Sequence, residues 1–458
     1  MKLPEKFKER MLTYEGVDAE KLFLALEEGE PQKAFRVNNI KISTDDYMAI
    51  NPFTAKEIPF AKAGFYTDVD KVGGSVLHHA GMIYMQDPSA MITVNAVAIK
   101  EGWCVFDACA SPGGKTTQLS AAVGESGIVV SNEYVTKRCR ILEENTVRLG
   151  CRNTVILNLD TKYIADFYPE KFNLVVCDAP CSGEGMFRKN ELAIQEWSPE
   201  NVQMCAERQM EILENCAKCV AEDGYLLYST CTFSLEENEM NVERFLNTHP
   251  EFCLCEVEDA VKQHTADGIC FEGCTRDMKK TRRFYPYVSD GEGQFIALMR
   301  KVESTISKNE VARRTKKQRD NKGKPQAAEL EAISVAKKFI EENLDGVEHL
   351  KPFVYNGKVY LCPDIEIMPF GVFSAGVCMG EVRKGRLIPS HHLFSALGKK
   401  FKNKIDLEPN DTRLIDYVGG FEIPLPEAKN GFGVITVCGA PLGGVKVSSG
   451  VGKNHYLK

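Results

Sequence analysis

The segment Trp103-Cys-Val-Phe-Asp-Ala-Cys-Ala-Ser-Pro-Gly-Gly-Lys-Thr-Thr117 decides the fold that this sequence predicts. Its first five residues form an apolar run that ends at Asp107, and the pattern after its glycines is that of an amphipathic helix. Four further strand-like runs follow, separated by helical patterns, at residues 128–131, 154–157, 172–177 and 225–229. Strands that alternate with helices indicate an α/β fold with a parallel, Rossmann-like sheet.

A chain of 458 residues suggests more than one domain. We expect four regions: an N-terminal accessory, RNA-binding domain over residues 1–80, the α/β core over 81–301, a basic linker over 302–327, and a small α+β or β-rich region over 328–458.

Local signals predict individual elements. In the N-terminal region we expect a helix near residues 18–28 and a strand over residues 35–42. In the core, Ser198-Pro199 predicts the start of a long helix, with serine as N-cap and proline in the first turn. The spacing from Ser234 to Glu237 predicts a capping box for the next helix.

The composition excludes several classes of protein. Hydrophobic residues make up 43% of the chain and charged residues 26%, which excludes a largely disordered chain. No apolar run reaches the roughly 18 residues of a membrane-spanning helix, and the charged residues 1–10 are unlike a secretory signal. The 17 cysteines then indicate reduced thiols. We therefore expect a cytoplasmic protein that acts away from membranes.

The charge is unevenly distributed. A net charge of -7 mildly disfavours a nucleic-acid binder. Residues 300–324, however, hold ten basic and three acidic side chains, a local +7, so the remainder carries -14. Because screening limits each charge to about 10 Å, this strip still suits phosphate groups. Residues 276–283 hold five further basic side chains before Phe284-Tyr-Pro, and they suit phosphate contact with base stacking, or equally a solvated loop.

Polar or reactive residues stand at the ends of the predicted strands. In an open parallel sheet the carboxyl ends of the strands meet at one edge, where ligands bind. We therefore expect a single site edge formed by Asp107, Glu133, Asp160, Asp178, Cys181 and Cys231.

The glycine-containing loop of this edge resembles a phosphate loop, but Cys109 stands where a P-loop requires glycine. Gly113 and Gly114 allow close backbone approach at a helix start. Glu133 follows about 20 residues later, a spacing that suits a carboxylate accepting ribose hydroxyls. Because no second phosphate-binding element appears, a nucleoside ligand such as S-adenosylmethionine fits this loop better than a dinucleotide. The alternative is that the loop is an ordinary tight turn and Glu133 a solvated side chain.

The two cysteines suggest a specific chemistry. A thiolate is a strong carbon nucleophile, and carbon 5 of cytosine is a poor one. Thiolate addition at carbon 6 makes carbon 5 enamine-like, so that it attacks a sulfonium methyl group, and loss of the carbon-5 proton then expels the thiol. Asp178 would favour the adduct by hydrogen bonding to cytosine N3 or its amino group. The plain alternative is that Cys181 and Cys231 are small buried residues, as free cysteines usually are.

Four segments carry a family resemblance: Tyr84-Met-Gln-Asp-Pro-Ser-Ala-Met91, Asp107 to Thr117, Asp178-Ala-Pro-Cys-Ser-Gly-Glu-Gly-Met-Phe-Arg188, and Tyr228-Ser-Thr-Cys-Thr-Phe-Ser234. In order and spacing they resemble the Nop/Sun-type RNA cytosine-5 methyltransferases over roughly residues 30 to 300. The resemblance implies a class I methyltransferase fold, S-adenosyl-L-methionine as methyl donor, and 5-methylcytidine in RNA as product.

The resemblance also implies residue roles. Cys231 matches the attacking thiol, Cys181 the second cysteine that assists product release, and Asp178 completes the catalytic set. The implied cofactor contacts are Cys109, Ala110, Ser111, Pro112, Gly113, Gly114, Lys115, Glu133, Arg138, Asp160 and Asp178. Ser111 is a small departure, since alanine is common there.

The tail resembles the C-terminal RNA-binding region of bacterial RsmF-type enzymes, which ends in a PUA-like fold. The matching segments are residues 376–397 and Gly439-Ala-Pro-Leu-Gly-Gly-Val-Lys446, although tryptophan often stands where this chain has Gly444. The resemblance implies 16S ribosomal RNA or the small ribosomal subunit as partner. We expect the enzyme to act as a monomer.

Several alternatives stay open. The substrate could be tRNA, or DNA with Cys181 as the attacking residue, and the chain could be a ribosome assembly factor without catalytic activity. Cys216 and Cys219 form a Cys-x-x-Cys pair inside the predicted helix, but a zinc site needs a second clean pair, so we expect no metal.

Overall fold

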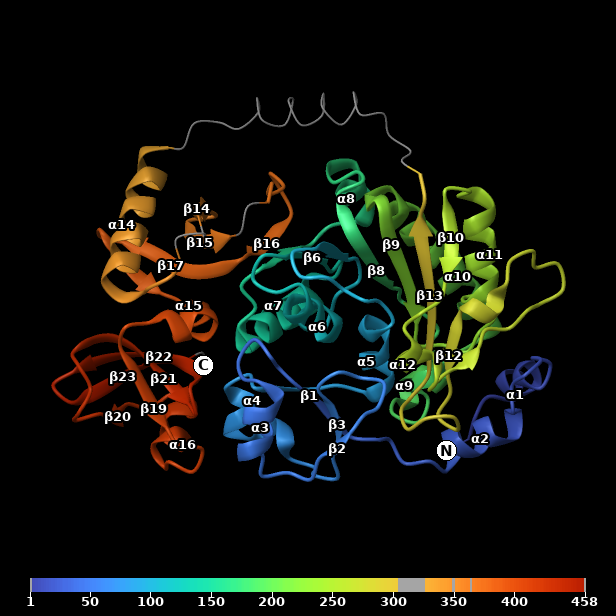
Figure 1. The fold of residues 1–458 in the computed structure, drawn as a ribbon, viewed down its shortest axis with the longest axis horizontal. Helices are drawn as coiled ribbons and strands as arrows, with labels where there is room; N and C mark the ends of the chain where they lie inside the picture. The colour runs from blue at the N-terminus through green and yellow to red at the C-terminus, as the bar shows by residue number, and fades with distance from the viewer. Residues whose placement is uncertain (1, 304–325, 348–350, 363–364, 457–458) are drawn as a thin grey trace.

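The computed structural model describes residues 2–303, 326–347, 351–362 and 365–456. Its centre is a ten-stranded sheet in the order β11-β12-β13-β9-β8-β5-β6-β7-β16, with β10 paired to β13 (Figure 1). Strands β5 to β9 run parallel to one another, and β13 is antiparallel to β9. The α/β fold with a parallel core is thereby confirmed.

The core elements have the following bounds: α5 Pro88–Asn95, β5 Cys104–Asp107, α6 Gly114–Ala122, β6 Ile128–Asn132, α7 Thr136–Leu149, β7 Thr154–Leu157, α8 Thr161–Phe167, β8 Phe172–Asp178, α9 Glu191–Glu196, α10 Pro199–Cys219, β9 Val220–Thr230, α11 Glu239–Thr248, β10 Phe252–Cys255, α12 Asp259–Lys262, β11 Ala266–Asp267, β12 Arg282–Phe284 and β13 Gln294–Lys301.

Alternating side chains of the central strands fill the two faces of this sheet. Phe106 and Val175 belong to the hydrophobic cluster on one face, and Val105 and Leu174 belong to the cluster on the other. This is the period-two pattern of a strand that is buried on both sides. The long helix α10 begins at Pro199 with the Ser198 side chain accepting from the Asn201 amide, as the sequence predicts.

The N-terminal part consists of α1 Glu5–Met11, α2 Ala19–Glu27, β1 Ala34–Val37, α3 Thr44–Ile50, β2 Lys56–Glu57, β3 Gly64–Tyr66, α4 Val76–His79 and β4 Ile83–Met85. Its strands form a small antiparallel sheet, β2-β3-β1-β4. Helices α1 and α2 lie apart from that sheet, beside the β12 side of the core (Figure 1). They pack through Phe7 and Leu22 against Phe187, Trp197 and Phe233, so this helical arm covers loops of the core.

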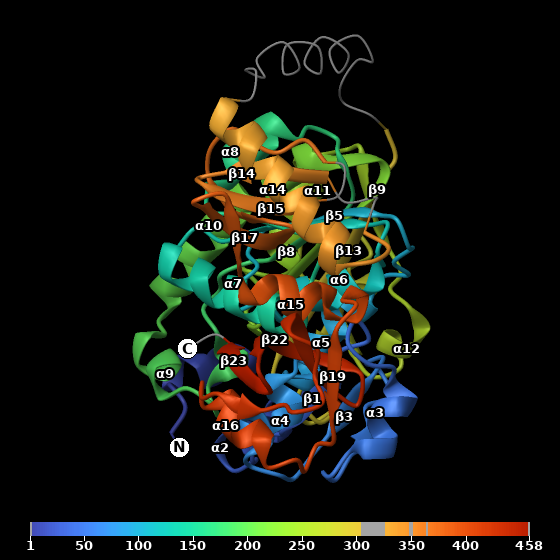
Figure 2. The same cartoon turned by 90° about the vertical axis from the view of Figure 1, so that its left-hand side faces the viewer.

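The C-terminal part consists of α14 Ala327–Asn343, β14 Lys351–Tyr355, β15 Lys358–Cys362, β16 Val372–Ala375, β17 Val377–Arg383, β18 Arg386–Pro389, α15 His391–Leu397, β19 Lys404–Leu407, α16 Arg413–Val418, β20 Ile423–Pro424, β21 Gly431–Val437, β22 Ala440–Ser448 and β23 Val451–His455. It forms two sheets, β14-β15-β17-β18 and β19-β21-β22-β23-β20, which lie one above the other beside the core (Figure 2). Strand β16 instead joins the edge of the core sheet by pairing with β7.

The departure at Gly444 has a packing reason. A Cβ atom at Gly444 would lie 2.2 Å from the ring of Phe394 on α15. The phenylalanine therefore fills the space that a side chain at this strand position would need.

Two local predictions were wrong. The strand expected over residues 35–42 ends at Val37, because the Asn38 side chain bonds to Gly81 O and Leu149 O and its carbonyl starts a turn that includes Lys41. The capping box at Ser234 and Glu237 is only half formed, because the Ser234 hydroxyl accepts from the Glu237 amide at 3.4 Å but no bond returns from the Glu237 side chain. Helix α11 begins at Glu239, and the Glu237 carboxylate is used by other partners, described below.

The basic linker expected over residues 302–327 lies almost entirely outside the described residues, so the division into four domains stays a prediction. Within the described part of the chain, no helix combines the length and apolarity needed to cross a membrane.

Candidate active site

The two cysteines singled out by the sequence meet at the carboxyl edge of the sheet. Strand β8 ends at Asp178 and is paired in register with β9, so that Asp178 lies opposite Ser229. Cys181 and Cys231 follow within three residues of this pair, and their Sγ atoms are 3.1 Å apart. The backbone amide of Cys231 also donates to Cys181 Sγ at 3.3 Å. The sheet thus brings together two thiols that are 50 residues apart in sequence.

Hydrogen bonds between the two loops fix the position of these thiols. Ser182, next to Cys181, places its Oγ 2.8 Å from Oγ1 of Thr232, next to Cys231. The same hydroxyl donates to the Glu237 carboxylate at 2.5 Å, and the Ser182 amide donates to that carboxylate at 3.0 Å. Gln209 on α10 adds a third donor at 2.7 Å. Glu237, which sequence analysis assigned to a helix cap, therefore joins the two cysteine loops.

Burial and the neighbouring thiol determine the protonation of Cys181. Its hydrogen bond to Cys231, together with burial, raises the pKa of the Cys181 thiol well above its usual range. At neutral pH, Cys181 is consequently held as a neutral thiol, in a hydrogen bond for which either sulfur can be the donor.

Asp178 connects the cysteines to the glycine loop. Its Oδ2 accepts from Lys115 Nζ at 2.7 Å, and its Oδ1 accepts from Ser229 Oγ at 2.6 Å and from Gln294 at 3.2 Å. Burial alone would lower the pKa of Lys115, but the Asp178 carboxylate raises it above its ordinary value. Lys115 and Asp178 therefore form a fixed ion pair, and both residues line the adjoining cavity.

A cavity of about 190 Å³ lies at this edge. Most of the glycine-loop residues that the sequence assigned to the cofactor line it, together with a second segment; the lining comprises Tyr84, Met85, Gln86, Asp87, Ala90, Cys109, Ala110, Ser111, Pro112, Gly114, Lys115 and Asp178. Sequence analysis gave residues 84–90 no part in the site, although the segment from Tyr84 to Met91 was one of the four that carried the resemblance.

Unpaired polar atoms at this edge point to a missing ligand. Within the described ranges, Nε2 of Gln86 is buried without a hydrogen-bond partner, as is Oδ1 of Asp107. Gly114 leaves room beside Gln86, because a Cβ atom at position 114 would crowd Gln86 Nε2 at a distance of 3.3 Å. Burial raises the pKa of Asp107 to about 7. Of Gln86 and Asp107, only Gln86 lines the cavity, where it offers a polar ligand a donor that the protein leaves free.

Four predicted cofactor residues do not line this cavity: Gly113, Glu133, Arg138 and Asp160. Glu133 is buried beyond β6 and accepts from the Val135 amide at 2.8 Å. Arg138 lies 3.5 Å from the Glu133 carboxylate and donates to Ser111 O at 3.0 Å. Asp160 caps α8 through the Lys162 amide. Gly113 lies in the glycine loop, Glu133 and Asp160 follow the ends of β6 and β7, and Arg138 lies in the first turn of α7. Their contact with a cofactor stays a prediction.

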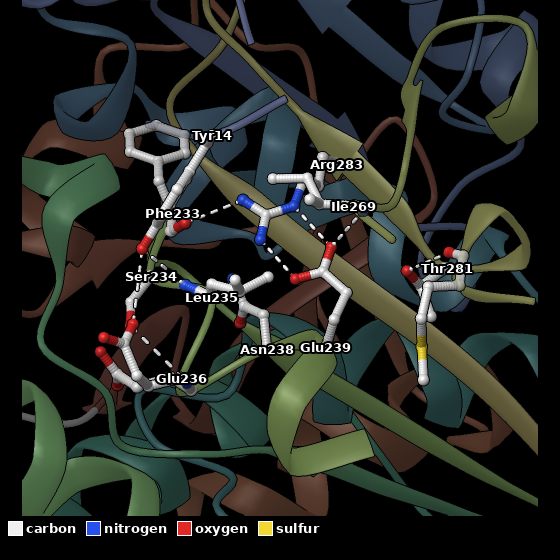
Figure 3. Close-up of polar contacts among 12 residues, drawn as sticks. Tyr14, Phe233, Ser234, Leu235, Glu236, Asn238, Glu239, Ile269, Thr281 and Arg283 are labelled. Atoms are coloured by element: carbon white, nitrogen blue, oxygen red, sulfur yellow. Dashed lines mark hydrogen bonds and ion pairs between the residues drawn. The ribbon is translucent and has the colours of Figure 1, made fainter. Parts of the chain in front are cut away.

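The loop after Cys231 is held by a buried ion pair (Figure 3). Arg283 on β12 forms a two-pronged contact with the Glu239 carboxylate, with its Nε at 2.6 Å, and Glu239 also accepts from the Ile269 amide. Arg283 donates to the Phe233 carbonyl at 2.8 Å. From the helical arm, Tyr14 accepts from the Leu235 amide at 3.1 Å.

These contacts overturn one interpretation of residues 276–283 for Arg282 and Arg283, whereas Arg276 and Lys279 of the same segment are exposed. Arg282 and Arg283, together with Phe284 and Tyr285, are buried, so they neither hold phosphates nor stack on bases, and they are no solvated loop either. Arg282 bonds to Thr265, and Arg283 to Glu239. The alternation of cations and aromatic residues reflects a strand packed in the core.

Cys216 and Cys219 are also core residues, buried on α10 in the cluster beneath the sheet. In the described part of the chain, no group of three histidine, cysteine, aspartate or glutamate side chains is arranged to hold a metal ion.

Comparison with known proteins agrees with this arrangement. Three family models match: the N-terminal domain of 16S rRNA methyltransferase RsmF over residues 3–88, 16S rRNA methyltransferase RsmB/F over residues 94–300, and the methyltransferase RsmF PUA domain over residues 404–458. The last confirms a PUA domain at the C-terminus.

Curated relatives carry the name ribosomal RNA small subunit methyltransferase F. The protein of Vibrio vulnificus is 34% identical over 318 residues, which span 67% of this chain but 65% of that relative's length. The protein of Vibrio campbellii is 29% identical over 427 residues, 90% of this chain and 87% of the relative.

Among solved structures, a methyltransferase homolog from Pyrococcus horikoshii is 28% identical, with a TM-score of 0.57 over 65% of this chain and 95% of that one. With matching family models along the core and at both ends, the chain belongs to the RsmF-type 16S rRNA methyltransferase family.

Proposed function

We propose that the protein transfers a methyl group from S-adenosyl-L-methionine to carbon 5 of a cytidine in 16S ribosomal RNA, through a covalent adduct between Cys231 and carbon 6 of the base. The observation that carries the proposal is the 3.1 Å separation of the Cys181 and Cys231 sulfurs beside Asp178. A cytosine ring that contacts both thiols also reaches the Asp178 carboxylate, which borders the cavity of the glycine loop.

The cavity residues fit S-adenosyl-L-methionine. Gln86, in the cavity wall, leaves a buried donor unpaired, and Gly114 leaves space beside it. In a class I fold the nucleoside lies at this strand edge, with a carboxylate such as Glu133 available to its ribose. When bound, the cofactor supplies an electrophilic methyl group.

The chain's own residues would act in sequence. Cys231, as thiolate, forms a bond to carbon 6, and Asp178 favours the adduct by a hydrogen bond at cytosine N3 or its amino group. Carbon 5 gains nucleophilic character and takes the methyl group. Its proton then passes to water, the bond between sulfur and carbon 6 breaks, and the aromatic ring is restored. Cys181, kept as a thiol by its raised pKa, donates to the departing Cys231 sulfur and so assists release.

The target base must leave its helix to reach both sulfurs, as in other enzymes that act on bases. Ribosomal RNA as substrate would place the protein in the cytoplasm. We propose that it acts as a monomer, since one copy of the chain supplies both cysteines, Asp178 and the cavity beside them.

The test compares three cysteine variants with labelled cofactor and RNA. Cys231→Ala should abolish turnover, and Cys181→Ala should accumulate a covalent protein–RNA adduct that survives denaturing electrophoresis. Cys253→Ala, an exposed cysteine on β10, is the matched control and should behave as wild type. A fully active Cys181→Ala without adduct would contradict the role of that residue.

Substrate identity needs a second measurement. Bisulfite mapping of total RNA from cells with and without the gene should show one or more lost positions in 16S rRNA. A loss confined to tRNA, or methyl transfer to DNA of the same sequence with Cys181 indispensable, would replace the proposed substrate. An absence of cofactor binding in calorimetry would favour an assembly factor without catalytic activity.

A further inference from the structure

A second cavity, of about 460 Å³, lies where three parts of the chain meet. Its walls come from the turn after β1, from the end of α6 with the turn before β7, and from α15 with the short helix η4, Gly398–Lys400. The end of α6 and the start of β7 belong to the amino edge of the parallel sheet. This cavity is therefore on the opposite edge of the sheet from the two cysteines.

The charge around this cavity is strongly positive. Four basic residues line it, namely Lys41, Arg152, Lys399 and Lys400, against one carboxylate, Glu125. That carboxylate is already paired with Arg152 at 2.7 Å. Within the described ranges, neither Lys399 nor Lys400 forms an ion pair, and the carboxylates that act on Lys399 are Asp46 and Glu125. Even without Lys41, the lining has an excess of two positive charges, in a chain whose net charge is -7.

The cavity wall is held in place by its own hydrogen bonds. Lys41, 2% exposed, donates to Ser395 O at 2.6 Å, Ser395 Oγ at 2.9 Å and Pro441 O at 2.8 Å, all of which are uncharged acceptors. Burial lowers the pKa of Lys41 well below its usual range, because none of these partners is an acid. On the facing side, Asn153 bonds to Ser120 and to the Gly124 carbonyl. A buried amine is thus fixed at the wall without a counter-charge, and an anion that approaches would favour its charged form.

We propose that this cavity binds a backbone phosphate of the substrate RNA. The proposal rests on RNA being the substrate, as argued above. Phosphate is the anion that a polynucleotide presents, and lysines with free ammonium groups contact it without reading sequence. Helix α6 starts at the cofactor loop and ends at this cavity, and its nine residues span about 13 Å. RNA that occupies both places must extend well beyond the target nucleotide, which fits a structured substrate.

The test measures binding of 16S rRNA transcribed in vitro to the full chain over a range of salt concentrations. The variant K399Q/K400Q removes the two unpaired charges, and the matched control K384Q/R386Q removes two exposed charges from the β17–β18 hairpin of the same C-terminal part. The cavity variant should lower the slope of log K against log salt by about 0.7 to 0.9 for each lost phosphate contact. It should raise KM for RNA and leave kcat unchanged, and the control should do neither.

The outcomes separate this proposal from the proposed function. Equal losses in both variants, or an unchanged slope in the cavity variant, would overturn the phosphate site while wild-type methyl transfer to RNA continued. A wild-type protein that binds RNA with the expected slopes but transfers no methyl group would support the cavity and overturn the chemistry. If inorganic phosphate stabilises the wild type but not K399Q/K400Q against heat, and RNA binding is equal in both, the site serves a free anion, and the RNA assignment is wrong.

Discussion

Ser182→Ala should impair methyl transfer although Ser182 does not contact the reacting atoms in the proposed mechanism. Its hydroxyl is shared between Thr232 at 2.8 Å and Glu237 at 2.5 Å, and all three side chains are buried. Removal of the hydroxyl leaves two buried polar groups each short of one partner. Such a loss costs about 1 to 3 kcal/mol, so about 2 kcal/mol is a fair central value.

The expected effect on activity follows from this free energy. The hydroxyl joins the loop of Cys181 to the loop of Cys231. Its removal should therefore destabilise, by about 2 kcal/mol, the arrangement in which the two sulfurs are 3.1 Å apart. If the arrangement is only marginally favoured in the wild type, its population and the single-turnover rate fall by up to about 30-fold in the variant. Cofactor affinity should not change, because Ser182 does not line the cofactor cavity.

Two assays together test this reasoning. Single-turnover methyl transfer reports the rate, and the rate of disulfide formation between Cys181 and Cys231 under a mild oxidant, read by mass spectrometry, reports their proximity. Ser289→Ala is the control, since that hydroxyl donates to His264 O away from the cysteines. Both rates should fall in Ser182→Ala and stay unchanged in Ser289→Ala. Wild-type rates in both assays for Ser182→Ala would refute the idea that these hydrogen bonds position the thiols.

Three further predictions concern stability and the loop of Cys231. Arg283→Met and Glu239→Gln should each cost about 3 to 5 kcal/mol in thermal or chemical unfolding of the core, because each leaves a buried charge alone, and the double variant should lose less than the sum. Burial raises the pKa of Glu237 to about 7, so between pH 4.5 and 7 the folded protein binds more protons than the unfolded chain. The free energy of unfolding should therefore fall by roughly 3 kcal/mol as pH rises through this window. Glu237→Gln should flatten that part of the profile of unfolding free energy against pH, and a profile as steep as that of the wild type would contradict the assignment. Tyr14→Phe should cost about 1 kcal/mol, since the Leu235 amide loses its acceptor, and should increase hydrogen exchange at Leu235 without changing cofactor affinity.

Local patterns predicted the sheet and its reactive edge. The strands that end at Asp107 and Asp178 are short buried runs bounded by helices, and parallel pairing places their carboxyl ends side by side regardless of the rest of the fold. For the same reason, Cys181 and Cys231 could be expected at one edge. Their 3.1 Å separation could not, since it depends on Ser182 and Glu237, whose partners lie on other loops.

The failures share a cause in long-range contacts. Glu237 has the spacing of a capping residue, but Ser182 and Gln209 offer it stronger partners. Arg283 follows a run of exposed-looking basic residues, and only the distant Glu239 makes its burial possible. The joining of β16 to β7 and the packing of α1 on the core are likewise set by surfaces that no periodicity reveals.

Two ion pairs with both side chains buried lie on the loops around the two cysteines, Arg188 with Glu292 and Arg283 with Glu239. A third buried pair, Lys301 with Glu170, lies elsewhere, at the end of β13 and before the start of β8. A buried ion pair adds little net stability over apolar residues of the same volume, because desolvation offsets the attraction, but it tolerates few geometries. Stability alone therefore gives no reason for the two pairs beside the cysteines, and fixed positioning does. On this argument, replacing both members of the Arg283–Glu239 pair with apolar residues should largely preserve the folded core, yet it should lower methyl transfer, because Phe233 in the loop of Cys231 loses the guanidinium that holds its carbonyl.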